Sequence, residues 1–187
     1  MANTALVVMD VQPSIMERYG NDNEQYLAAV QDTVQAARQA NMPVIFVVVG
    51  FRPGFPEVSS NNRGFSTIRD RADEGMINPQ PALPVEPNDI VVTKRRISAF
   101  AGSDLEVVLH GQGVDHMVLC GIATSGVVLS TVREAADKDY RLTVLSDLCL
   151  DGDEEVHRVL TEKVFPRQAT VTTGEQWVAS LTEGREA

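Results

Sequence analysis

Three features of this chain that could carry chemistry each follow a run of apolar residues. Asp10 comes directly after the first run, Lys94 ends a later one, and the turn Gly121–Val127 follows a third. If these runs are parallel strands of one sheet, their carboxyl ends meet at one edge, where α/β proteins bind ligands. A carboxylate and an ammonium group favour each other's charged forms, whereas burial opposes both, so the protonation state stays open. The convergence predicts a site; the alternative is a turn-capping aspartate and a surface lysine.

The elements that must position these residues begin with six short apolar runs rich in β-branched residues. Their hydrophobicity is continuous rather than alternating, which indicates strands covered on both faces and therefore a parallel sheet between helical layers. The predicted strands are 5–9, 44–49, 90–93, 117–120, 142–145 and 169–172.

Helix-compatible segments separate the strands. Acidic or capping residues stand where the helix N-termini need hydrogen-bond acceptors, as at Ser103–Glu106 and Asp151–Glu154. Right-handed crossovers then give a three-layer αβα sandwich, Rossmann-like, with a mostly parallel six-stranded sheet. We expect one domain over 1–187, with a long active-site or interface loop at about 50–87. The predicted helices are 24–40, 105–111, 127–138, 154–163 and 175–181.

The run Gly121–Val128, read Gly-Ile-Ala-Thr-Ser-Gly-Val-Val, resembles the signature of the isochorismatase-like, or cysteine hydrolase, superfamily. In that signature a nucleophilic cysteine opens a helix after a Gly-(Ile/Val)-Ala-Thr-Asp run. Here Val127 occupies the position of the cysteine and Ser125 that of the aspartate. Asp10 and Lys94 match the other two members of the family's Asp-Lys-Cys triad in order, and so the resemblance covers nearly the whole chain.

The segment after Lys94 strengthens the resemblance. Ser98, Phe100 and Leu105 fall close to the family pattern Lys-x-x-x-Ser-x-Phe-x-Gly-Thr-x-Leu. The resemblance implies an isochorismatase-like hydrolase fold and a hydrolase activity. Isochorismatases proper also lack the cysteine and cleave a vinyl ether, which implies Asp10 as general acid or base and Lys94 as its electrostatic partner.

The resemblance also implies how the turn works. In similar proteins the peptide that corresponds to Ile122–Ala123 is cis, and amides after it, near Gly126, point at the substrate as an oxyanion hole. Around this turn we expect substrate contacts from polar, aromatic and arginine side chains. An arginine offers the planar fork that grips a carboxylate, although solvated loop arginines are commoner. The expected substrate-binding residues are Gln12, Arg52, Phe100, Thr124 and Ser125.

No residue obviously replaces the missing thiol nucleophile. Cys120 and Cys149 lie in or beside apolar runs, where a free cysteine usually packs as a small core residue. Thr124 and Ser125 carry hydroxyls in the right loop, but no histidine is near either in sequence to activate them. Three readings remain: a hydrolase of a small anionic metabolite that needs no thiol, a catalytically degenerate member that binds a ligand or protein partner, and an amidohydrolase with a non-family nucleophile.

Composition limits the partners. The chain has 16 basic and 26 acidic residues among 187, a net charge of −10, which disfavours nucleic acid and anionic membranes. The region after the second strand lacks the histidines with which related nicotinamidases hold a divalent ion, so we expect no metal and no cofactor. With no apolar stretch long enough for a bilayer and no signal-peptide layout, we expect a cytoplasmic homodimer or higher homo-oligomer that takes a small-molecule substrate.

Overall fold

The computed structural model describes residues 3–19, 23–68 and 74–183. Its strands form one six-stranded sheet in the order β3-β2-β1-β4-β5-β6, and every neighbouring pair is parallel. The predicted sheet is therefore confirmed, and it is parallel throughout rather than mostly so. The strands are β1 (Thr4–Met9), β2 (Val44–Val49), β3 (Ile90–Lys94), β4 (His116–Ile122), β5 (Arg141–Leu150) and β6 (Thr170–Thr172).

The burial of the strands explains their composition. Every residue of β2 is buried, as is every residue of β1 after its first, because both strands lie inside the sheet with a helical layer on each face. The edge strands β3 and β6 are only partly buried and carry threonines among their apolar residues. Continuous β-branched runs thus mark the centre of the sheet, as expected for parallel strands covered on both faces.

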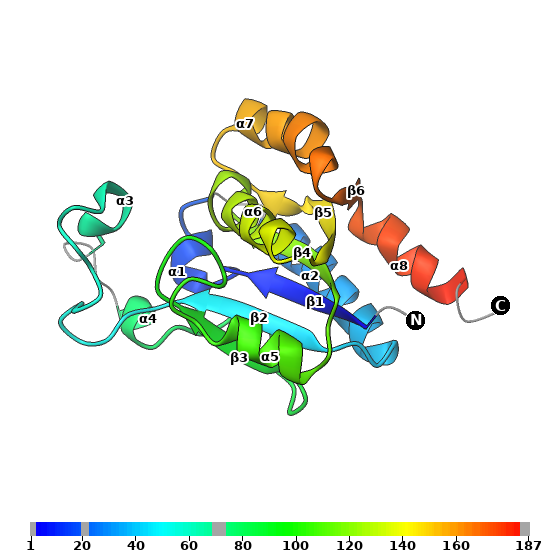
Figure 1. Cartoon of the computed structure of the whole chain (residues 1–187), viewed down its shortest axis with the longest axis horizontal. Helices are drawn as coiled ribbons and strands as arrows, with labels where there is room; N and C mark the ends of the chain where they lie inside the picture. Colours follow the sequence, from blue (N-terminus) through cyan, green and yellow to red (C-terminus); the bar gives the residue numbers. More distant parts are fainter. Residues whose placement is uncertain (1–2, 20–22, 69–73, 184–187) are drawn as a thin grey trace.

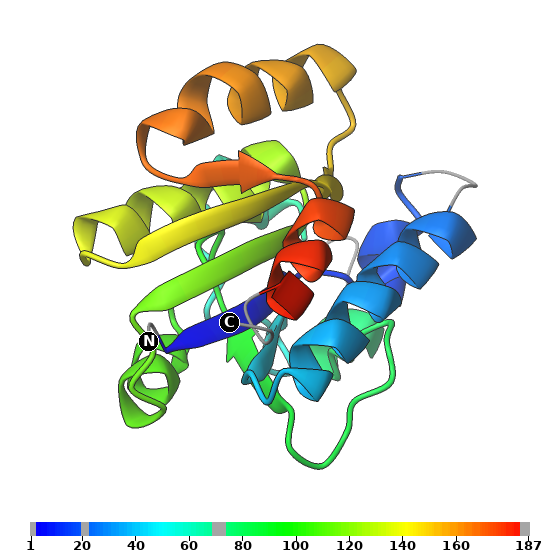
Figure 2. The same ribbon diagram turned by 90° about the vertical axis from the view of Figure 1, so that its right-hand side faces the viewer.

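Helices cover both faces of the sheet. Figures 1 and 2 show α2 (Asn23–Gln39) beside α8 (Gly174–Glu183) on one face, and α5 (Leu105–Gly111) and α6 (Leu129–Asp137) on the other. The short helix α7 (Glu154–Val159) lies past the β6 edge. This arrangement is the predicted αβα sandwich. No helix of the described residues is long and apolar enough to cross a membrane.

Two predicted helices are more divided than their sequences indicate. The segment 127–138 begins earlier, with a π-helical turn at Thr124–Val128 that is kinked at Gly126, where φ −98° and ψ −105° lie outside the helical range. The segment 154–163 also changes to a π-helical turn, at Leu160–Val164. A 3₁₀ turn at Phe165–Arg167 follows it, and the proline in this turn lacks the amide that would continue an α-helix.

The long segment 50–87 has more structure than a loop. It contains two short helices, α3 (Arg63–Ser66) and α4 (Glu74–Ile77), and a third short helix, α1 (Pro13–Met16), follows β1. Backbone hydrogen bonds join Phe51 N to Met76 O at 2.7 Å and Ala82 N to Val11 O at 2.8 Å. The described part of the segment therefore packs back across the carboxyl edge of the sheet; residues 69–73 lie outside the described residues.

The sheet also fixes where a site can form. Strand β1 lies between β2 and β4, so the chain runs outward from β1 in one direction and returns on its other side to start β4. Such a reversal of strand order leaves a crevice at the carboxyl ends of the two strands. Gly121 near the end of β4 has φ +142°, and a Cβ there would lie 2.0 Å from the Met9 carbonyl oxygen. Only glycine allows β1 and β4 to approach this closely at the crevice.

Candidate active site

Asp10 and Lys94 form a buried ion pair at this crevice. Asp10 directly follows β1 with φ +56°, a left-handed conformation that aspartate tolerates, and Lys94 is the last residue of β3. The Lys94 Nζ lies 2.8 Å from Asp10 Oδ2, and their side chains are 2% and 8% exposed. The predicted convergence of the two residues is confirmed, and both are buried rather than on the surface.

Lys94 has all its donor capacity engaged. Besides Asp10, its Nζ donates to the carbonyl oxygens of Arg96 at 2.9 Å and Ile97 at 3.0 Å. Three acceptors match the three N–H bonds of an ammonium group. The lysine has no donor left for a substrate and acts on the site through its charge.

Asp10 keeps one oxygen free. Its Oδ1 is buried without a hydrogen-bond partner among the described residues, while Oδ2 accepts from Lys94. Burial raises the pKa of Asp10 to about 6, although the charge of Lys94 and its hydrogen bond pull it down. Because Oδ2 is engaged, a proton taken up near that pH belongs on Oδ1.

Asp10 lines a small, mostly apolar cavity of about 200 Å³. Pockets for drug-sized ligands are larger, about 300–1,000 Å³, so this one suits a small metabolite. Val127, Ile122, Ala123 and Gly126 lie on its wall as expected, and the described lining residues include no cysteine. The lining residues are Asp10, Ile15, Arg18, Tyr19, Val49, Phe65, Ile68, Met76, Lys94, Ile97, Ile122, Ala123, Gly126 and Val127.

The turn beside the cavity differs from the expected oxyanion hole. The Ile122–Ala123 peptide is cis. However, the amides of Gly126 and Val128 donate to the Ala123 carbonyl at 3.0 and 3.2 Å, and the Ser125 amide donates to the Asp151 carboxylate at 2.6 Å. The prediction that amides after the cis bond point into the cavity is therefore wrong for these three, because the π-helical turn and Asp151 use them.

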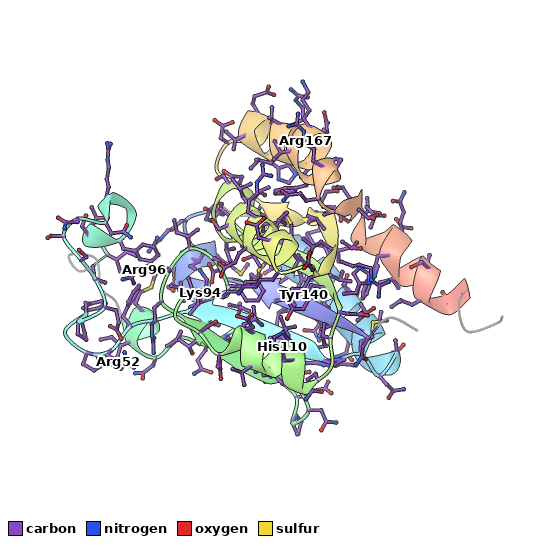
Figure 3. The ribbon with its side chains drawn as sticks, viewed as in Figure 1. Arg52, Lys94, Arg96, His110, Tyr140 and Arg167 are labelled. Carbon is purple, nitrogen blue, oxygen red and sulfur yellow. The ribbon has the colours of Figure 1, made fainter. Side chains whose placement is uncertain are left out.

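Two of the expected substrate contacts bind protein groups instead. The Gln12 side chain accepts from Val49 N at 2.7 Å and donates to Val49 O at 3.2 Å, so it ties the segment after β1 to the end of β2. Arg52 pairs with Glu57 in the long segment, well away from Lys94 (Figure 3). Neither residue is on the described cavity wall. Contacts between segments distant in sequence decide which residues reach that wall, so the sequence pattern did not show it.

Phe100, Thr124 and Ser125 also lie off the described cavity wall. Phe100 stacks on Tyr140 with ring centroids 6.2 Å apart, in the layer of α5 and α6. The Thr124 hydroxyl, fully buried, lies 2.8 Å from Nδ1 of His157. The sequence pattern did not indicate this contact, because His157 lies 33 residues after Thr124 and is brought to the turn by α7. A hydroxyl without access to the cavity positions the turn and cannot reach a substrate.

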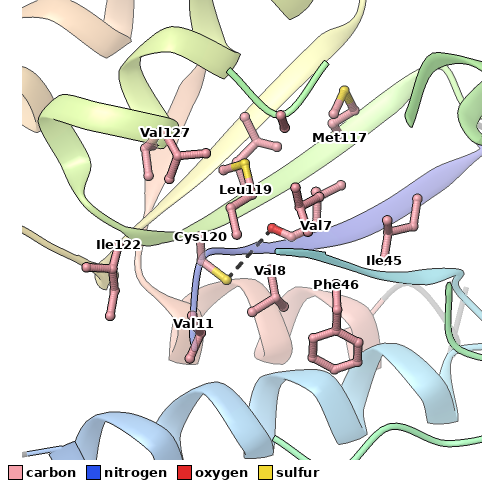
Figure 4. Packing of buried hydrophobic residues seen from close by; sticks show 14 of the residues in the cluster. Val7, Val8, Val11, Ile45, Phe46, Met117, Leu119, Cys120, Ile122 and Val127 are labelled. Carbon is pink, nitrogen blue, oxygen red and sulfur yellow. Dashed lines mark hydrogen bonds between the residues drawn. The ribbon is translucent and has the colours of Figure 1, made fainter. Parts of the chain in front are cut away.

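The two cysteines are packed away from the Asp10 cavity. Cys120 is fully buried in β4, and its sulfur faces the Val7 carbonyl on the α2 side of the sheet, whereas Val127 lies on the α6 side (Figure 4). Cys149 lines a different cavity, of about 700 Å³, which shares Tyr19 with the first. Burial raises the pKa of Cys149 to about 12 and that of Cys120 well above its usual value. Both thiols stay protonated and are poor nucleophiles.

Two cavity residues escaped the sequence-based reasoning. Arg18 and Tyr19 follow the short helix α1 and line the cavity with Asp10. Their position eight and nine residues after Asp10 was the available signal, since the segment after the first strand must cross the crevice. As for metals, the described residues contain no group of three or more His, Cys, Asp or Glu side chains arranged to hold an ion.

Comparison with known proteins agrees with this geometry. The model of the isochorismatase domain matches residues 4–176. The chain belongs to the isochorismatase family. An uncharacterized isochorismatase family protein of Bacillus subtilis, YwoC, is 32% identical over 95% of this chain and 94% of its own length. The ureidoacrylate amidohydrolase RutB of Pseudomonas syringae is 31% identical over 96% of this chain and 81% of its own.

The fold of this isochorismatase-family chain is also that of a solved relative. An isochorismatase family protein from Burkholderia thailandensis superimposes with a TM-score of 0.82 at 30% identity, covering 96% of each chain. The family is one of hydrolases, and the amidohydrolase relative is an example. The chain is therefore an isochorismatase-family hydrolase with the αβα fold of its relatives.

Proposed function

We propose that this hydrolase cleaves a small anionic metabolite by acid–base chemistry at Asp10, without a thiol nucleophile. The observation that supports this most is the buried, unpartnered Oδ1 of Asp10, a residue that lines a cavity whose described lining holds no cysteine. A buried carboxyl group with a free oxygen and a pKa near 6 can exchange a proton with a bound substrate near neutral pH.

The reaction that suits these groups is hydrolysis of a vinyl ether. The Oδ1 proton of Asp10 moves to the terminal carbon of the vinyl group, and water adds to the resulting oxocarbenium carbon. The hemiketal then breaks its ether bond, releasing a ketone and an alcohol, and a proton from water returns to Asp10. Lys94 stabilises the carboxylate that exists between these steps, through its 2.8 Å contact with Oδ2. No covalent enzyme intermediate is needed.

The competing functions make different demands on the residues. An amidohydrolase with a non-family nucleophile needs an accessible thiol or activated hydroxyl, and Cys120, Cys149 and Thr124 are all buried away from Asp10. A protein that only binds a ligand does not require a carboxyl group that exchanges a proton near neutral pH. The proposal also takes the enzyme to be cytoplasmic and a homodimer or higher homo-oligomer, as the resemblance and composition indicate.

The test compares turnover of isochorismate and ureidoacrylate by the wild type, Asp10→Asn and Asp115→Asn. Asp115 is the matched control, because its carboxylate pairs with Arg141 on the exposed surface. We expect Asp10→Asn to lose about 10²-fold or more in kcat/KM on the vinyl ether, the usual effect of removing a general acid, with Asp115→Asn unchanged. Equal activity of Asp10→Asn and wild type, or absence of turnover by the wild type, would contradict the proposal.

A further inference from the structure

The wall of the Asp10 cavity carries a basic side chain that is not part of the Asp10–Lys94 ion pair. Lys94 and Asp10 neutralise each other, and all three donors of Lys94 are used inside the protein. Arg18 is the other basic residue on the described cavity wall. Its guanidinium has no hydrogen bond or ion pair with any described residue, although the structure assigns partners to Arg52, Arg95 and Arg96 nearby. Arg18 is exposed, so its guanidinium is free to grip a carboxylate that enters the cavity.

Tyr19 supplies a second donor beside Arg18. Its side chain is half-buried and lies on the walls of both the 200 Å³ and the 700 Å³ cavities. Burial raises the pKa of Tyr19, and the carboxylates of Asp151 and Asp10 raise it further against the opposing effect of Arg18. The phenol therefore stays protonated at neutral pH and can donate a hydrogen bond to an anion.

The remaining wall is apolar and sets the rest of the ligand. Phe65, Ile68, Met76, Ile97 and Val127 surround the space between the polar groups. The cavity thus suits an anionic group joined to a compact apolar body.

We propose that Arg18, assisted by the hydroxyl of Tyr19, binds a carboxylate of the substrate and so places the bond to be cleaved beside Asp10. The substrate class is then a small carboxylate with an unsaturated or aromatic body. This inference rests on the proposed function for the meaning of "substrate", but the binding step can be measured without turnover.

The chain offers a matched control for Arg18. Arg52 is also an exposed arginine, but it pairs with Glu57 and is not on the described cavity wall. Replacing either arginine with glutamine removes one positive charge from a chain of net charge −10. A difference between Arg18→Gln and Arg52→Gln therefore reports contact at the cavity and not the overall field.

The experiment measures binding of benzoate and of its neutral isostere benzamide by ligand-observed NMR. We expect the wild type to prefer benzoate, and Arg18→Gln to weaken benzoate about five- to tenfold with benzamide unchanged, the effect of one charge-assisted hydrogen bond. Arg52→Gln should leave both affinities unchanged, and Arg18→Lys should keep part of the preference. Tyr19→Phe should weaken benzoate about threefold.

Three results would overturn the assignment: a wild type that binds benzoate no better than benzamide, equal losses in Arg18→Gln and Arg52→Gln, or a full preference in Arg18→Gln. An unchanged Tyr19→Phe would remove Tyr19 from it. Failure of the proposed function can be told apart from failure of this assignment. The function test measures the turnover of Asp10→Asn, whereas this test measures the preference for benzoate over benzamide. Selective loss in Arg18→Gln with full turnover by Asp10→Asn would leave the binding site standing and the chemistry refuted.

Discussion

At the scale of single residues, the site depends on the two oxygens of Asp10 having different surroundings. Oδ2 is held 2.8 Å from the Lys94 ammonium, and Oδ1 is buried without a partner among the described residues. Burial outweighs the lysine, so the pKa of Asp10 rises to about 6 instead of falling as in an exposed ion pair. The proton that the proposed reaction needs is therefore available near neutral pH, on the oxygen that Lys94 leaves free.

This pKa predicts the pH profile of the enzyme. A general acid works in its protonated form, which for Asp10 exists below about pH 6. We expect kcat/KM for isochorismate to be constant at low pH and to fall about tenfold per pH unit above pH 6. The measurement is the pH–rate profile of the wild type. A rate that rises through pH 6 would show that Asp10 acts as a base on the free enzyme.

The residue at position 127 predicts a change in thiol chemistry. Val127 lies on the cavity wall in the turn that precedes α6, near the charge of Lys94. A cysteine there gains a stabilised thiolate, whereas the native thiols are buried and protonated. We expect iodoacetamide at pH 7 to modify Val127→Cys at position 127 and to leave the wild type unmodified, as read by mass spectrometry. Rapid alkylation of native Cys120 would show that its burial has been misjudged.

At the scale of elements, the site is held by the close approach of β1 and β4 and by the turn that follows β4. Gly121 allows the approach, and Asp151 and His157 hold the turn by accepting from Ser125 N and by contacting the Thr124 hydroxyl. These contacts hold the shape of the turn, and the Asp151 carboxylate takes the Ser125 amide away from the cavity.

The same geometry predicts that Gly121→Ala is severely destabilising. The new Cβ would meet the Met9 carbonyl oxygen at 2.0 Å, and alanine disfavours φ +142°. We expect a loss of about 3 kcal/mol or more in the free energy of unfolding, at the upper end of single-residue effects. Gly152→Ala is the control, since nothing lies within 4 Å of its Cβ position. Equal urea midpoints for the two variants would contradict this role of Gly121.

The elements also show what the sequence could predict. Strands β1 and β2 were found because burial on both faces demands continuous apolar runs, and Asp10 and Lys94 because they end such runs. The start of α6 and the shape of the turn before it were not predicted, because a hydrophobic pattern carries no information on the dihedral angles of Gly126. Arg52 was chosen and Arg18 overlooked for a related reason: which loop arginine meets the cavity depends on contacts distant in sequence.

At the scale of the whole molecule, a net charge of −10 surrounds a cavity proposed to take an anion. The field of the surface opposes such a ligand, so binding depends on the local charge of Arg18. The assembly of the chain is a further expectation from the family resemblance. Sedimentation velocity should show a species of at least twice the 20.4 kDa of one chain, and a single monomeric species at micromolar concentration would contradict it.

The central claim is that hydrolysis depends on Asp10 and not on a thiol. The chain contains two cysteines, so Cys120→Ala combined with Cys149→Ala gives an enzyme without any thiol. The decisive measurement is kcat/KM for isochorismate of this folded double variant beside Asp10→Asn. The account predicts that the thiol-free enzyme stays within about twofold of the wild type while Asp10→Asn loses about 10²-fold or more. Activity lost with the thiols and kept without the Asp10 carboxylate would contradict it.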